Sequence, residues 1–189
     1  LVEADVPGLG ATARAVRVLG PDGAEVPSQL LDGNTVLFVA KVPPVGFAVF
    51  DVQAADAPAP SALKVTESSL ENARYRLTVD RNGDVASVYD KSLGKELLAG
   101  PARLEIKTDK PAQWPAWNMD YADQMRAPRA YVSGPAKVRV VENGAARVAL
   151  EVAREAEGST FVQTIRLAAG DAGARVEFAN LIDWNTRES

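Results

Sequence analysis

The sequence predicts an all-β fold, in which an antiparallel β-sandwich is preceded by part of a smaller β domain. From Leu70 onward, apolar and polar residues alternate with the period of two that half-buried strands require. The pair Asn82-Gly83 separates two such runs, a pattern typical of a tight hairpin. No stretch has a long helical period with capping residues, so the crossover helices of a parallel sheet are not expected.

The first 53 residues are expected to form the small β unit. Its expected strands are residues 13–19, 36–40 and 46–53. Residues 54–62 are expected to be a linker, because their two prolines cannot donate to a β ladder and they lack an apolar face. The large sandwich is then expected over residues 63–189.

The large domain is predicted to open on a hairpin. Tyr75, Leu77 and Val79 alternate with polar residues, and a second alternating run at 85–89 follows the turn. Further strands are expected at residues 103–108, 136–142, 146–154, 160–168 and 175–182. Turn residues separate these runs, so an antiparallel arrangement is favoured.

Composition excludes several classes of partner. The formal net charge is -4 and the 21 Lys and Arg residues are scattered along the chain, so no nucleic-acid partner is expected. The longest apolar runs, such as residues 45–50, fall far short of the ~20 residues that cross a bilayer. No membrane partner is therefore expected.

Histidine and cysteine are both absent, which removes Ser-His-Asp and Cys-His catalytic arrangements and every zinc site built on imidazole or thiolate. The lack of a disulfide framework favours a reducing compartment, and we expect the cytoplasm. Leu1 is not an initiating Met and no leader-like segment follows it, so we expect the chain to begin within a longer protein.

Four motifs occur in order along the chain. They are K-V-P-P-V-G-F at 41–47, L-E-N-A-R-Y at 70–75 leading into D-R-N-G at 80–83 and D-K at 90–91, W-P-A-W-N-M-D at 114–120, and D-W at 183–184. In this order they resemble the C-terminal β domains of glycoside hydrolase family 38, the α-mannosidases. The third motif is similar to the family's W-D-A-W-x-x-D loop, with Pro115 in place of the usual acidic residue.

The resemblance implies a supersandwich of the galactose mutarotase-like type. It implies C-terminal truncation as well, because the family continues with further sheet after the strand that ends in Trp184. An open sheet edge of this kind allows a homo-oligomer to form.

The resemblance also implies a parent enzyme that is a retaining α-mannosidase of mannose metabolism, with its zinc ion and nucleophilic aspartate in an N-terminal α/β barrel. Retaining chemistry needs two carboxyl groups about 5 Å apart across the sugar. We expect this chain to contain no catalytic residue, metal ligand or cofactor of its own. Its expected partners are the barrel of the same polypeptide and carbohydrate.

Trp114, Trp117 and Asp120 are the candidate carbohydrate contacts. Indole rings stack on sugar faces, and Asp120 matches the aspartate of the family loop. An alternative interpretation is that the two tryptophans pin a long loop against the sandwich or against the barrel. Asp109 and Asp123 flank this loop and could form an acid/base pair with Asp120, although solvated turn aspartates are the commoner case.

Asp80, Asn82 and Asp84 have the spacing of the first ligands of a calcium loop, but Val85 occupies the required glycine position, so we predict a tight turn. Two other functions were weighed. A free-standing carbohydrate-binding sandwich would use Trp114 and Trp117 as its platform. An aldose epimerase of similar fold is disfavoured, because its chemistry is expected to use histidine.

Overall fold

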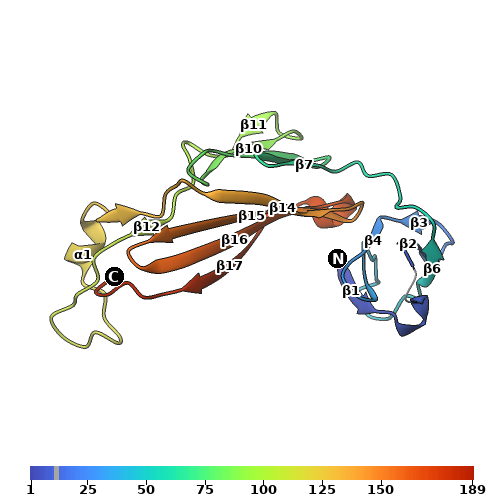
Figure 1. Ribbon diagram of the computed structural model, residues 1–189, viewed down its shortest axis with the longest axis horizontal. Coiled ribbons are helices and arrows are strands. Elements are labelled where there is room, and N and C mark those ends of the chain that lie inside the picture. Colours follow the sequence, from blue (N-terminus) through green and yellow to red (C-terminus); the bar gives the residue numbers. More distant parts are fainter. Residues whose placement is uncertain (11–12) are drawn as a thin grey trace.

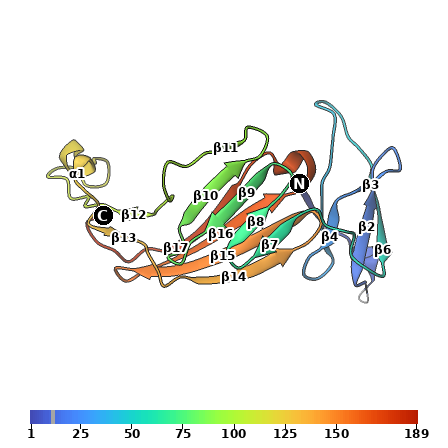
Figure 2. The same cartoon turned by 90° about the horizontal axis from the view of Figure 1, so that it is seen from above.

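The structure is a computed structural model that describes residues 1–10 and 13–189. Its elements form an elongated molecule with a small β unit at one end and a long two-layered sandwich beside it (Figure 1). The view from above shows the strands of the sandwich running away from the small unit toward a helical segment at the far end (Figure 2). The expected all-β architecture is confirmed, because the sheets are antiparallel throughout.

The small unit consists of two three-stranded sheets. One has the spatial order β1 (Val2–Asp5), β5 (Thr35–Phe38) and β4 (Ser28–Leu30), and the other β3 (Glu25–Val26), β2 (Ala15–Leu19) and β6 (Asp51–Ala55). A short 3-10 helix, η1 (Pro7–Leu9), follows β1. Val16, Val18, Val36 and Phe38 form its buried core, since each strand turns alternate apolar residues inward.

The strand expected at residues 46–53 is placed wrongly. The observed β6 begins at Asp51 and continues through Ala54 and Ala55, which pair with Val16 and Ala15 of β2. These two alanines therefore belong to a strand and not to the expected linker. Alanine has weak β propensity, and pairing with the neighbouring strand overrides it here.

The sandwich is built from one five-stranded and one four-stranded sheet. The first has the order β11 (Lys95–Glu96), β10 (Val85–Asp90), β9 (Tyr75–Val79), β8 (Ser69–Glu71) and β7 (Lys64–Thr66). The second has the order β14 (Lys137–Asn143), β15 (Arg147–Ala156), β16 (Ser159–Ala168) and β17 (Glu177–Asp183), with η2 (Gly170–Gly173) between its last two strands. Leucine and valine side chains of both sheets meet in one core, with Leu77, Leu150 and Ile165 at full burial.

Between the two large sheets the chain makes a separate two-stranded ribbon. The strand expected at 103–108 shrinks to β12 (Glu105–Ile106), which pairs with β13 (Ala130–Tyr131), and α1 (Tyr121–Met125) lies between them. The remaining expected strands of the large domain agree with the observed ones within two residues at each end.

The turn between β9 and β10 is the contact point of the two sheets. Asp80 accepts hydrogen bonds at Oδ1 from the backbone N–H groups of Asn82 (2.8 Å) and Asp84 (3.0 Å), which confirms the predicted turn. Gly83 has a positive φ of 81°, and a Cβ there would lie 2.6 Å from Val152 of β15. Only glycine allows the hairpin to approach the facing sheet this closely.

Asp84 and Arg154 form a buried ion pair across the sandwich. The Asp84 carboxylate lies 2.8 Å from Nη1 of Arg154, and both side chains are only 2% exposed. The same guanidinium donates to the carbonyl of Val132 at 3.0 Å. One arginine of β15 therefore links the β9–β10 turn and the chain that follows β13.

The small unit is joined to the sandwich through the β14–β15 turn. Gln29 of β4 accepts backbone N–H bonds at Oε1 from Ala146 (3.1 Å) and Arg147 (2.8 Å). A Cβ on Gly144 would overlap the Gln29 side chain, so this turn needs glycine at that position. Arg147 also pairs with Glu3 of β1 at 2.9 Å. Each unit thereby satisfies polar groups of the other.

The Asp84→Ala change should destabilise the chain by about 3–5 kcal/mol, because it leaves the Arg154 charge buried without its partner. Denaturant unfolding followed by circular dichroism measures this loss. Glu25→Ala is the control, since Glu25 pairs with Arg17 at the exposed surface and its loss should cost at most about 1 kcal/mol. Equal losses for the two variants would contradict a structural role for the buried pair.

The Gln29→Ala change should cost about 1–3 kcal/mol, because two buried N–H groups lose their acceptor. The same denaturation experiment applies. Gln113→Ala, at an exposed position, should change the free energy of unfolding by less than about 0.5 kcal/mol. A Gln29→Ala protein with unchanged unfolding would show that the junction contributes nothing to stability.

Candidate functional site

The predicted carbohydrate contacts lie in one long loop, residues 109–126, which we call the Trp segment. It leaves the sandwich after β12, includes α1 and returns at β13, at the end of the molecule opposite the small unit (Figure 1). The Asp109 N–H donates to the Glu188 carbonyl (2.8 Å), and Lys107 Nζ donates to the Gln124 carbonyl (2.8 Å). Both ends of the loop are thus tied to the rest of the chain.

Glu188 also holds the loop through its side chain. Lys110 Nζ lies 2.7 Å from its carboxylate, and this hydrogen bond raises the pKa of Lys110 above the ordinary value. The pair is exposed to solvent, so it adds little stability by itself. It nevertheless connects the start of the Trp segment to the residues that follow β17.

Trp114 and Trp117 project into solvent. Trp114 has a positive φ of 56°, and its carbonyl accepts hydrogen bonds from the N–H groups of Trp117 and Asn118, both at 2.9 Å. The exposed fractions are 66% for Trp114 and 85% for Trp117. Neither indole packs against the sandwich, so sugar contact and packing on a further domain remain as the two predictions.

Asp120 begins helix α1. Its carbonyl accepts the N–H groups of Asp123 (2.9 Å) and Gln124 (3.2 Å), and its Oδ2 accepts the N–H of Ala112 (3.3 Å). Its other carboxylate oxygen has no hydrogen-bond partner among the described residues. Asp120 therefore shapes the loop and keeps one oxygen for a ligand.

The two other aspartates of the loop differ from Asp120 in their surroundings. Asp123 is buried, pairs with Arg126 at 2.8 Å and accepts the N–H of Lys110 at 3.2 Å, so its charge is compensated locally. Asp109 has one buried carboxylate oxygen without a hydrogen-bond partner in the described part of the chain. The contacts of Asp123 fit a structural role better than that of a catalytic acid.

Three further apolar side chains of the Trp segment were not singled out from the sequence. Met119, Tyr121 and Met125 are all largely exposed, like the two tryptophans. The signal was present, since large apolar residues recur through residues 114–125 without a strand or a long helix to bury them. A surface of this kind on one loop marks a contact site for a ligand or another domain.

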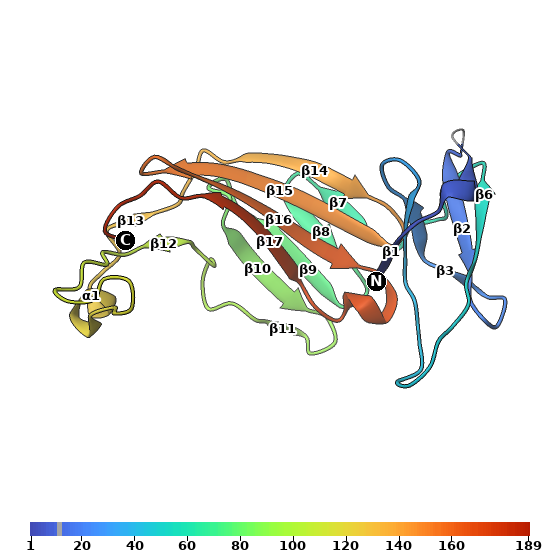
Figure 3. The same cartoon turned by 90° about the horizontal axis from the view of Figure 1, so that it is seen from below.

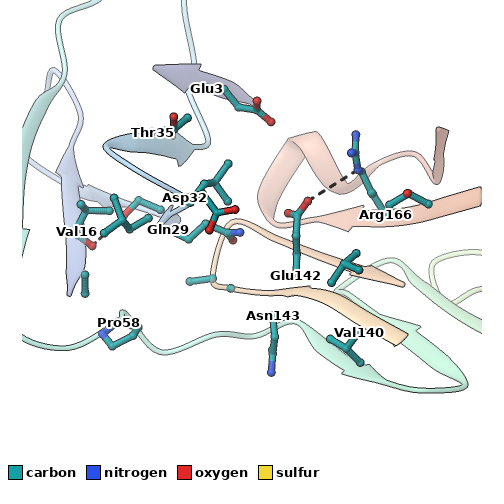
Figure 4. A pocket seen from close by; sticks show the side chains of 18 of the residues that line it. Glu3, Val16, Gln29, Asp32, Thr35, Pro58, Val140, Glu142, Asn143 and Arg166 are labelled. Carbon is teal, nitrogen blue, oxygen red and sulfur yellow. Dashed lines mark hydrogen bonds and ion pairs between the residues drawn. The ribbon is translucent and has the colours of Figure 1, made fainter. Parts of the chain in front are cut away.

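The largest cleft lies elsewhere, between the small unit and the sandwich (Figure 4). It has a volume of about 990 Å³. Gln29, Asp32 and Thr35 line one wall, and Glu142 and Arg166 line the other. The described residues around it include no aromatic side chain, so the cleft offers no platform for a sugar ring.

The charged groups of this cleft are already paired. Burial disfavours the charged form of Arg147, but hydrogen bonds to Glu142 and Glu3 outweigh it and raise the pKa of this arginine. Glu151 pairs with Arg139 at 2.6 Å. The cleft therefore has little uncompensated charge with which to attract an ionic ligand.

The chain does not fit the zinc site that the family resemblance implies for the parent enzyme. It has no histidine or cysteine, and residues 1–10 and 13–189 contain no group of three acidic side chains that could hold a metal. A zinc ion therefore has no ligand set here. Among the described helices, none is both long and apolar enough to span a membrane.

Comparison with known proteins places these features in a family. No curated protein matches the chain. The fold is similar to the crystal structure of an alpha-mannosidase from Enterococcus faecalis V583, with a TM-score of 0.59 and 11% sequence identity over 99% of this chain, which spans 28% of that one. At this identity the likeness shows the fold alone.

The family model of the glycosyl hydrolases family 38 C-terminal domain matches residues 70–189, which include the Trp segment and both sheets of the sandwich apart from β7. The match confirms the resemblance drawn from the sequence motifs. This chain therefore belongs to glycosyl hydrolase family 38, and its large sandwich is that family's C-terminal domain.

Proposed function

We propose that this chain is the β region of a glycoside hydrolase that acts on α-mannosides, and that it supports a zinc-dependent catalytic barrel in the same polypeptide. The observation that carries the proposal is the family match over residues 70–189. The α-mannosidase of similar fold is much longer than this chain, which leaves room for a separate catalytic part. The lack of cysteine favours a cytoplasmic location.

The surroundings of the buried carboxylates support a role without catalysis. A general acid for glycoside hydrolysis needs a raised pKa. The Ser92 hydroxyl, followed by Arg74, instead holds the pKa of Asp90 below its ordinary value. Asp84 and Asp123 are each paired with an arginine. These carboxylates are arranged to stay charged and to stabilise the fold.

In this proposal the Trp segment forms part of the wall of the substrate cleft. Trp114 and Trp117 present exposed indole faces that suit stacking on the apolar face of a mannose ring. The Asp120 oxygen that has no partner is available for a sugar hydroxyl. Carbohydrate contact by these three residues adds to binding and leaves bond cleavage to the barrel.

In the longer enzyme, Trp117→Ala should raise KM for an α-mannoside about fivefold, because an aromatic contact of about 1 kcal/mol is lost. The value of kcat should change little, since the residue does not touch the reacting atoms. Steady-state hydrolysis of a chromogenic α-mannoside measures both constants.

Phe47→Ala is the matched control for this variant. Phe47 is as exposed as Trp117 but lies in the small unit, at the other end of the molecule. Its replacement should leave KM unchanged. Unchanged mannoside kinetics in the Trp117→Ala enzyme would remove the sugar-contact role and leave the domain-packing role.

A free-standing carbohydrate-binding module is the second candidate, and the exposure of both indoles favours it. Calorimetric titration of this chain with manno-oligosaccharides separates the two functions. The supporting role predicts no measurable affinity without the barrel. Binding in the micromolar to millimolar range that is lost in Trp114→Ala would instead establish a binding module.

A further inference from the structure

Strand β17 forms an open edge of the four-stranded sheet. All seven of its residues pair with β16 in unbroken register, from Glu177 opposite Arg166 to Asp183 opposite Thr160. In the described part of the chain no strand pairs with its other edge. That edge therefore presents a row of backbone N–H and C=O groups that can pair with a further strand.

The other edges of the sandwich are protected, whereas β17 is not. On the opposite edge, β14 carries Lys137 and Arg139 and has a register shift between Val140 and Glu142. The edge strands of the facing sheet, β7 and β11, have three residues and two. Charge, irregularity and short length are the usual means of blocking strand addition. The β17 sequence E-F-A-N-L-I-D has no lysine, arginine, proline or bulge.

The side chains of β17 are also left uncovered on the core side of the sheet. Phe178 and Ile182 lie opposite Ile165 and Phe161, which are buried, so they point to the same inner face. Their own exposed fractions are 44% and 47%. The main core includes no described residue of β17 (Figure 3). Partly exposed apolar residues on an inner face indicate that a neighbouring strand is missing.

The charges of β17 favour a strand of different sequence over a second copy. In the two-fold antiparallel register that pairs all seven residues, Glu177 would lie opposite Asp183 at both ends. Like charges directly opposite each other destabilise a sheet. Asp183 has no ion-pair partner among the described residues, whereas Glu177 pairs with Arg175. A basic residue on the incoming strand would complement Asp183.

We infer that β17 pairs with a strand from a segment of the same polypeptide outside residues 1–189. That strand carries apolar residues where it covers Phe178 and Ile182, and a lysine or arginine beside Asp183. The inference rests on the proposed function, in which this chain is part of a longer enzyme. The alpha-mannosidase of similar fold, of which this chain spans 28%, has ample further chain to supply such a strand.

Hydrogen exchange at single-residue resolution in the longer enzyme tests this. A paired β17 should protect all its backbone amides over residues 177–183 by on the order of 100-fold or more. An open edge leaves every second N–H without an acceptor. Exchange at the unprotected rate on alternate residues would overturn the inference, whether or not the enzyme hydrolyses mannosides.

A pair of variants identifies the occupant. Ile182→Lys places a charge where the incoming strand covers the inner face, so β17 should lose its protection while the enzyme stays monomeric. Leu181→Lys is the control, because Leu181 lies on the outer face of the same strand and is largely exposed. Should wild-type protection accompany a dimer that Ile182→Lys dissociates, the partner is a second copy and the inference fails.

Discussion

The ion pair of Asp84 and Arg154 is the contact on which the arrangement of the large domain depends. It joins the turn between β9 and β10 to the middle layer of the facing sheet, at a point where Gly83 lets the two backbones approach. The same arginine reaches the Val132 carbonyl, which lies just beyond β13. Because β13 closes the Trp segment, the pair that aligns the two sheets also sets where that loop leaves the sandwich.

The family motifs of this chain divide into two groups by their surroundings. Those of the first group are structural. Asn72 uses both ends of its side-chain amide, accepting from the N–H of Tyr75 and donating to the Ala168 and Gly173 carbonyls. Lys91 binds Glu71 and the Asn72 carbonyl. These contacts hold the hairpins of one sheet against the other, and they need those residue types because the polar groups are partly or wholly buried.

The motif of the second group, around Trp114 and Trp117, makes few contacts of its own with the sandwich. Its backbone is ordered by local turns and by Asp120 and Asp123, while its apolar side chains face outward. At the other end of the molecule, Val45 and Phe47 are similarly exposed on the loop between β5 and β6. A rigid sandwich with apolar groups at both ends is well suited to act as a spacer between other parts of a larger enzyme, which agrees with the proposed supporting role.

The amino-acid pattern by itself determined the fold class and the family. Alternation in the runs that became β9, β15 and β16 is strong because one face of each is buried, and the Asn82-Gly83 turn is a local signal that needs no distant contact. Only the tertiary structure decided that Ala54 and Ala55 form part of β6, because a weak strand former pairs where its neighbour provides a ladder. The exposure of the tryptophans and the uncovered inner face of β17 likewise depend on which elements lie beside them, and side-chain burial is a property of that arrangement and not of local sequence.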